Sequence, residues 1–275
     1  LMKIDAHQHF WNYDPINFSW INEEMAAIRK DFLPEDLKPI LKKNGIDGSI
    51  LIQVNQNESE NEVFLKFAEE NEFIKGMVGW IDLIAKDLDN KLQHYSQFPK
   101  MRGFRHIVQG EPDDFLMDQA FIDAVAKFPK YDFTYDILVL ERQLKAVLHF
   151  VRQLPNNKLI IDHIAKPNIK EKSITRWSNY MQAIAKHENV YVKVSGMLTE
   201  ADIKNWKKED FTIYLDHVLD FFGSERTVYG SDWPVCLVAG SYEDQLGIIQ
   251  DYFSRLSKTE QAQIFGLNAA KFYGV

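Results

Sequence analysis

Met2-Lys-Ile-Asp-Ala-His-Gln-His-Phe10 is the first of eight short segments rich in apolar and β-branched residues, and the recurrence of such segments decides the fold. The other seven cover residues 45–54, 74–82, 101–108, 133–139, 158–163, 190–195 and 227–232. Most of the intervening stretches carry apolar residues at the spacing of a helix. Eight strand and helix alternations predict a (β/α)8 barrel, because a doubly wound sheet usually stops at about six strands.

The composition describes a globular chain with a small-molecule partner. No Pro-, Gly- or Ser-rich linker divides the sequence, so we expect one domain over residues 1–275. The net charge of −8, without a basic block, argues against nucleic acid as a partner. No segment approaches the roughly 18 apolar residues that a membrane helix needs. Nothing in the sequence separates a monomer from a homodimer.

Cys236 is the single cysteine of the chain, which excludes an intrachain disulfide. No basic N-terminal region leads into an apolar stretch of signal-peptide length, so we expect a cytoplasmic protein. No Cys or His lies near Cys236 at the spacing of a metal site or a catalytic triad. We therefore interpret Cys236 as a small buried hydrophobic residue.

Four polar residues at the ends of predicted strands form the candidate site. The active site of a barrel lies at the C-terminal ends of its strands, and His7 and His9, two residues apart, share one face of the first strand. His163 ends the sixth strand and Asp232 ends the eighth. Two imidazoles and a distant carboxylate are typical of a centre that binds a divalent ion or activates a water.

In this interpretation Asp232 is the general base that accepts a proton from the attacking water. Each residue also has a structural alternative. The histidine pair could only form hydrogen bonds at the barrel mouth, His163 could be a core residue bound to a backbone carbonyl, and Asp232 could cap the following helix. Asp162, next to His163, should point the opposite way along a strand and is interpreted as structural.

Arg105 and His106 end the fourth predicted strand, and only one of the two can face the barrel interior. Either could hold an oxyanion or a substrate carboxylate, with a salt bridge as the structural alternative for Arg105. Lys193 lies within the seventh strand, where a buried ammonium needs a partner. We count it among the candidate substrate-binding residues, and whether it faces the site or the outside stays open.

Aromatic residues near strand ends or in the first loop are usually core, but they also stack on the apolar faces of sugar rings. The chain has five such residues, Trp11, Trp20, Trp80, Tyr135 and Trp233. Among them we expect Trp80, Tyr135 and Trp233 to contact the substrate.

Several motifs resemble those of the amidohydrolase superfamily, in particular the branch that contains sugar lactonases. They are Asp5-Ala-His-Gln-His-Phe-Trp11, Gly103-Phe-Arg-His-Ile107, Asp162-His-Ile-Ala-Lys-Pro167, Lys193-Val-Ser-Gly196, Gly230-Ser-Asp-Trp-Pro-Val-Cys236 and Phe265-Gly-Leu-Asn-Ala-Ala-Lys-Phe-Tyr273. The likeness covers nearly the whole chain. It is nearest to L-fuconolactone hydrolases, with L-rhamnonolactone and pyrone-dicarboxylate lactonases more distant.

This resemblance implies hydrolysis of an aldonolactone to its open-chain acid, with Asp232 activating the water. His7, His9 and His163 match positions that bind metal or polarise the carbonyl. The fifth strand, Asp132-Phe-Thr-Tyr-Asp136, lacks the lysine or histidine found in many two-metal members. The resemblance therefore implies at most one divalent ion, Zn²⁺ or Mn²⁺, or none. Without an ion, protonated histidines or Arg105 would have to stabilise the oxyanion.

Two other functions are compatible with the same residues. A related decarboxylase of an aromatic or unsaturated acid would use a similar set of histidines and an aspartate. A catalytically silent sugar-binding barrel would keep the aromatic residues but would have no use for Asp232.

Overall fold

The computed structural model describes residues 2–275 and contains eight parallel strands in the order β1 to β8, each paired with the next. The strands are β1 (Ile4–Gln8), β2 (Gly48–Ile52), β3 (Ile74–Gly79), β4 (Met101–Ile107), β5 (Thr134–Leu138), β6 (Lys158–Ile161), β7 (Val190–Val194) and β8 (Thr227–Tyr229). Each predicted segment contains one strand. The predicted (β/α)8 barrel is therefore confirmed.

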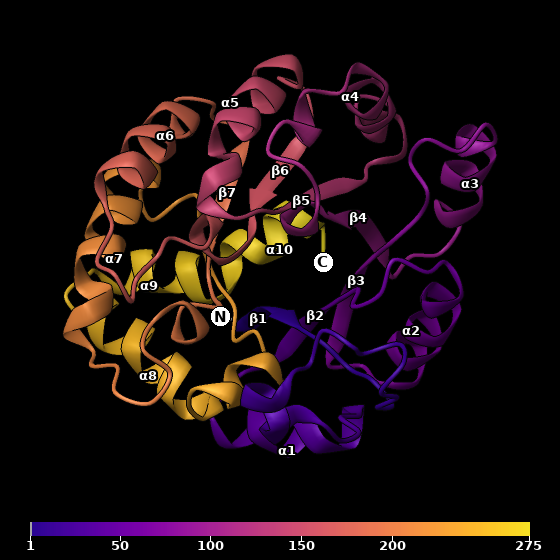
Figure 1. Ribbon diagram of the computed structural model, residues 1–275. Coiled ribbons are helices and arrows are strands. Elements are labelled where there is room, and N and C mark those ends of the chain that lie inside the picture. Colours follow the sequence, from indigo (N-terminus) through magenta and orange to yellow (C-terminus); the bar gives the residue numbers. More distant parts are fainter. Residues whose placement is uncertain (1) are drawn as a thin grey trace.

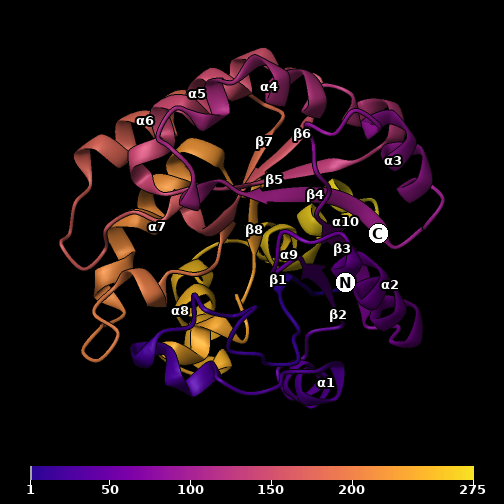
Figure 2. The same ribbon diagram turned by 45° about the vertical axis from the view of Figure 1, so that its right-hand side comes forward.

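Helices form a ring outside the strands (Figures 1 and 2). They are α1 (Pro34–Lys43), α2 (Ser59–Glu70), α3 (Leu88–Tyr95), α4 (Gln119–Val125), α5 (Leu144–Gln153), α6 (Thr175–Ala185), α7 (Glu209–Phe222) and α8 (Tyr242–Phe253). After them come α9 (Lys258–Ala262), a π-helical turn (Gln263–Leu267) and α10 (Asn268–Tyr273). Within residues 2–275, no helix combines the length and the apolar character needed to cross a membrane.

Contacts between β1 and the segment after β8 close the barrel. The backbone N–H of Asp232 donates to the carbonyl of His7, and that of His9 donates to the carbonyl of Trp233, each over 2.8 Å. Gln8 and Trp233 form an isolated parallel bridge at the same place. The closure therefore sets His7 of β1 and His9, the residue after Gln8, directly beside Asp232.

The C-terminal helix fills the opposite end of the barrel. Ala269, Phe272 and Tyr273 of α10 pack in one cluster with residues of the strands. The strand residues are Ile4, Ala6, Ile50, Ile52, Val78, Ile160 and Val228. Asn268 of α10 donates to the carbonyl of Thr227, the first residue of β8. Because α10 covers the N-terminal ends of the strands, the site is built at their C-terminal ends, the usual side for barrel enzymes.

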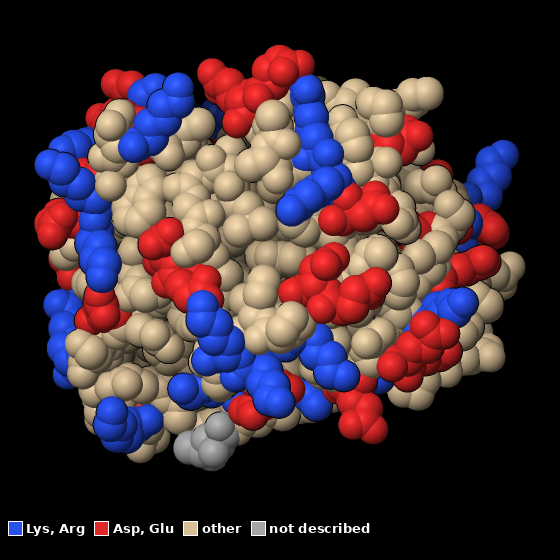
Figure 3. All heavy atoms as spheres, turned by 90° about the horizontal axis from the view of Figure 1, so that it is seen from below, with Lys and Arg blue, Asp and Glu red and all other residues tan. Residues whose placement is uncertain are grey.

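Acidic and basic side chains alternate over the face seen in Figure 3, without a continuous patch of one sign. This face thus offers no extended basic surface of the kind that binds nucleic acid. Cys236 is buried, with 1% of its surface exposed, as predicted.

Gly266 provides a test of how α10 is held. Any Cβ at this position would collide with the backbone carbonyl of Met2, which cannot move without disturbing β1. We predict that Gly266→Ala destabilises the fold by about 1–3 kcal/mol, the usual cost of overpacking. Gly247→Ala in α8 is the control, because a Cβ there meets no atom within 4 Å. It should stabilise the helix by about 0.5–1 kcal/mol. Urea unfolding measures both, and equal stability of Gly266→Ala and the wild type would contradict the packing described.

Candidate active site

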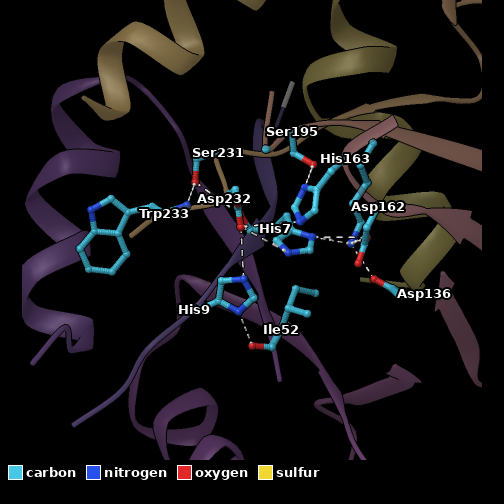
Figure 4. Close-up of polar contacts among 12 residues, drawn as sticks. His7, His9, Ile52, Asp136, Asp162, His163, Ser195, Ser231, Asp232 and Trp233 are labelled. Atoms are coloured by element: carbon cyan, nitrogen blue, oxygen red, sulfur yellow. Dashed lines mark hydrogen bonds and ion pairs between the residues drawn. The ribbon is translucent and has the colours of Figure 1, made fainter. Parts of the chain in front are cut away.

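Three imidazoles converge on the carboxylate of Asp232. Its Oδ1 atom lies 3.3 Å from Nε2 of His9, 3.7 Å from Nε2 of His7 and 3.8 Å from Nε2 of His163. All four residues are at least 95% buried. Figure 4 shows the rings arranged around this carboxylate. The structure thus brings together the four residues predicted from the strand ends.

The other nitrogen of each ring contacts the protein. Nδ1 of His9 donates to the carbonyl of Ile52 over 2.9 Å, because a carbonyl can only accept. Nδ1 of His163 lies 2.9 Å from Oγ of Ser195. Nδ1 of His7 lies 3.4 Å from Oδ1 of Asp162. These partners fix the ring orientations and leave the Nε2 atoms directed at the centre, the arrangement typical of metal-binding histidines.

Burial favours the neutral form of His7 and His163. It is the main cause that lowers the pKa of His163 to about 4 and the pKa of His7 well below its usual value. Burial alone would raise the pKa of Asp232, but the adjacent His163, His9 and His7 hold it below the usual range. Neutral imidazoles beside an ionised carboxylate are the protonation states that bind a metal.

A left-handed turn carries His163 into the site. His163, Ile164, Ala165 and Lys166 have φ values of 53°, 48°, 60° and 47°, a conformation that costs an L-residue about 1–2 kcal/mol. The Nε1–H of Trp177 donates to the carbonyl of Ile164 and supports the turn. A run of strained residues next to a site indicates a functional constraint.

The turn also corrects an expectation about Asp162. Because the left-handed conformation begins at His163, the His163 side chain returns to the side that Asp162 faces, and the prediction that the two point opposite ways is wrong. Asp162 is fully buried and contacts Arg105 and His7. Gly196 makes room for the arrangement, because a Cβ there would collide with the ring of His163.

A buried network of charges lies beneath the histidines. Nζ of Lys193 contacts Oδ2 of Asp136 at 2.6 Å, Oδ1 of Asp162 at 3.0 Å and Nδ1 of His7 at 3.1 Å. Tyr273 of α10 donates its hydroxyl to Asp136 over 2.8 Å. Lys193 therefore faces the barrel interior, and it supports His7 from below without lining the cavity above the site.

Arg105 also faces the barrel interior. Its Nε and Nη2 donate to the side chain and the backbone carbonyl of Gln53, and its Nη1 donates to Asp162 over 3.0 Å. The second N–H of Nη1 faces Nε2 of His7 at 3.3 Å, so one N–H of Nη2 is left without a partner among the described residues. Since Arg105 lines the cavity, this N–H is available to a ligand.

A cavity of about 540 Å³ opens above the four converging residues. Its lining comprises His9, Trp11, Trp20, Asn22, Glu24, Met25, Val54, Arg105, Ile107, Gln109, Leu138, His163, Lys166, Thr199, Glu200, Ile203, Asp232, Val235 and Val238. This volume and the mixture of an apolar wall with a few polar groups are typical of small-molecule sites.

The structure does not place the predicted aromatic residues in this lining. Tyr135 is fully buried and packs against Phe121 and Phe150 outside the barrel. Trp233 is 1% exposed and its ring meets Phe32 edge to face. Both were expected to contact the substrate, but their side chains point into the layer between strands and helices.

Trp80 and His106 also lie outside the lining. Nε1 of Trp80 donates to Nδ1 of His106 over 3.3 Å, and Nε2 of His106 lies 2.8 Å from Glu111. Because Arg105 faces inward, the alternation along β4 turns His106 away. The aromatic residues that do line the cavity are Trp11 and Trp20 of the first loop.

The converging residues fit one divalent ion. In a tetrahedral site with metal–ligand bonds of about 2.0–2.1 Å, the ligand atoms lie about 3.4 Å apart, close to the separations around Oδ1 of Asp232. His7, His9 and Asp232 form one candidate group of ligands. A second group, His7, Asp162 and His163, already has a cation beside it, the ammonium of Lys193. His7, His9 and Asp232 would hold a single ion, and Nε2 of His163 approaches the same carboxylate at 3.8 Å.

Comparisons with known proteins agree with this geometry. The sequence profile of the family described as Amidohydrolase matches residues 4–275, and the chain belongs to this family. The chain is thus an enzyme of a hydrolase family, as predicted from its motifs.

Individual relatives match over their full length. A protein named L-fucono-1,5-lactonase from Burkholderia multivorans is 35% identical, covering 100% of this chain and 96% of the relative. A protein of the same name from Burkholderia ambifaria is 34% identical over 99% and 96%. A crystal structure of an amidohydrolase from Burkholderia multivorans with bound zinc superposes with a TM-score of 0.97 at 35% identity, covering 100% of both chains.

We predict that the chain, stripped of metal by a chelator, binds one equivalent of Zn²⁺ in a calorimetric titration. His9→Asn should weaken this binding at least about tenfold, because it removes one ligand. His94→Asn serves as the control, since His94 is exposed on α3 and far in sequence from the site. Binding of two equivalents, or unchanged affinity of His9→Asn, would contradict the single-ion site.

Proposed function

We propose that this protein hydrolyses a sugar lactone, L-fucono-1,5-lactone or a related L-sugar lactone, to the open-chain acid. The observation that carries the proposal is the convergence of three Nε2 atoms on Asp232 at the floor of a cavity of about 540 Å³. Relatives that share about a third of their residues over the whole chain carry the name L-fucono-1,5-lactonase, which supports the choice of sugar.

In the proposed reaction Asp232 acts as the general base. Its carboxylate stays ionised because the neighbouring imidazoles lower its pKa, so it can accept a proton from a water that attacks the lactone carbonyl. A divalent ion held by His7, His9 and Asp232 would polarise this carbonyl and acidify the water. In this proposal the free N–H of Arg105, which lines the cavity, donates to the developing oxyanion.

Collapse of the tetrahedral intermediate breaks the bond between the carbonyl carbon and the ring oxygen. The proton taken up by Asp232 passes to this ring oxygen, which becomes the hydroxyl of the product. The product acid ionises at neutral pH, so each turnover releases one proton. His7 and His163 stay neutral throughout, since burial lowers the pKa of both.

The charges of the cavity favour a neutral substrate over the anionic acid that a decarboxylase needs. Of the basic side chains in the lining, Arg105 pairs with Asp162 and Lys166 pairs with Glu200. A substrate carboxylate would have to compete with these acids for its partner. A lactone needs only hydrogen bonds and apolar contact.

We retain the cytoplasmic location and the monomeric or homodimeric state as predictions.

Asp232→Asn tests the assigned mechanism. We predict that it lowers the turnover number about 10²–10⁴-fold, the usual contribution of a general base, without unfolding the protein. Proton release followed with a pH indicator, on L-fucono-, L-galactono-, L-rhamnono- and D-gluconolactone with and without a chelator, measures the loss and any role of an ion. Asp220→Asn, an exposed position on α7, is the matched control. Full activity of Asp232→Asn would refute the mechanism, and a wild type inert towards every lactone would refute the function.

A further inference from the structure

Three side chains from different loops meet on the wall of the cavity. Nζ of Lys166 lies 3.1 Å from Oε1 of Gln109 and 3.2 Å from Oε1 of Glu200. Gln109 follows β4, Lys166 follows β6 and Glu200 follows β7. All three line the cavity together with Asp232 and His163. The mechanism above gives none of the three a part in the chemistry.

The strained turn after β6 serves Lys166 as well as His163. Lys166 is its last left-handed residue, and its backbone N–H donates to the carbonyl of His163 over 2.8 Å. One turn thus fixes both a side chain at the reacting centre and an ammonium on the wall. An exposed lysine tethered by an ordinary loop would not need four left-handed residues, so the position of Lys166 is under functional constraint.

The Lys166–Glu200 pair is built for a neutral polar ligand. The two charges cancel, and both side chains keep about a fifth of their surface accessible. Among the described residues, Gln109 and Glu200 are the polar contacts of Nζ, so one of its three N–H bonds is free. Oε2 of Glu200 likewise accepts no hydrogen bond within residues 2–275, and the wall nearby is apolar, with Leu138 and Ile203.

We propose that Lys166 and Glu200 form a subsite for two adjacent hydroxyl groups of the substrate, and this proposal rests on the proposed lactonase function. The ammonium donates to one hydroxyl oxygen, and the carboxylate accepts the proton of its neighbour. Hydroxyls on adjacent ring carbons are separated by about one hydrogen-bond length, which matches the 3.2 Å between Nζ and Oε1.

Such a subsite selects its substrate because its polar groups cost free energy when they are left without a hydrogen-bond partner. A lactone without the two hydroxyls would displace water from Lys166 and Glu200 and return no hydrogen bond, so it would be strongly rejected. Gln109 is a positioning residue in this account, because its amide oxygen holds the ammonium in place. The charged pair therefore sets which lactones are opened, while Asp232 opens them.

Steady-state kinetics of Lys166→Met and Glu200→Gln on L-fucono-1,5-lactone and on δ-valerolactone, which has no hydroxyl groups, test the subsite. The measured quantity is the ratio of kcat/KM for the two lactones. We expect each variant to lower this ratio at least tenfold, mainly through a higher KM for the sugar lactone. Lys170→Met is the matched control, since Lys170 is exposed and lies outside the lining. It should keep the wild-type ratio.

Glu200→Gln preserves size and shape, so it keeps the test valid if Lys166→Met folds poorly, which thermal unfolding would reveal. An unchanged ratio in a folded variant overturns the subsite while leaving the lactonase function intact. An equal loss on both lactones also overturns it, because that result indicates a general structural role. A wild type that opens no sugar lactone refutes the proposed function and the subsite with it.

Discussion

The site depends on the buried contacts that the ammonium of Lys193 makes at the centre of the barrel. The ammonium contacts Asp136 of β5, Asp162 after β6 and His7 of β1, so one charge ties three strands together. A buried charge is tolerated only when it is paired, and removal of one partner of a buried pair typically costs about 3–5 kcal/mol. The network therefore fixes the orientation of His7, and through His7 the position of the site above it.

This network also sets the charge of the site. Lys193 and Arg105 face the carboxylates of Asp136 and Asp162, Asp232 adds a third carboxylate, and burial lowers the pKa of His7 and His163. The centre thus carries one negative charge in excess when Asp136 is ionised, and burial raises the pKa of Asp136 to about 6. An excess of negative charge beside the three converging Nε2 atoms favours a cation. In the part of the lining that the structure describes, Arg105 and Lys166 both pair with acids, in agreement with a neutral lactone.

The sequence predicts the barrel, and the structure brings together the four residues that strand periodicity singles out. His7 lies in β1, while His9, His163 and Asp232 closely follow β1, β6 and β8, and parallel strands of a barrel end on one rim. The failures have local causes. Asp162 faces inward in alternation with Ile160, and the left-handed conformation that begins at His163 brings that side chain back to the same site, which no strand pattern indicates. Tyr135 and Trp233 point outward. The pairing of Lys166 with Glu200 joins distant loops and has no signal in a single sequence.

A crystal structure of the protein with the open-chain acid L-fuconate bound would test the central claim most directly. We predict that the product carboxylate accepts a hydrogen bond from Arg105 at the floor of the cavity, beside the three Nε2 atoms, with two hydroxyls on Lys166 and Glu200. A carboxylate bound to Lys166 instead, with hydroxyls at the histidines, would contradict it, because the reacting carbon would then be remote from the base.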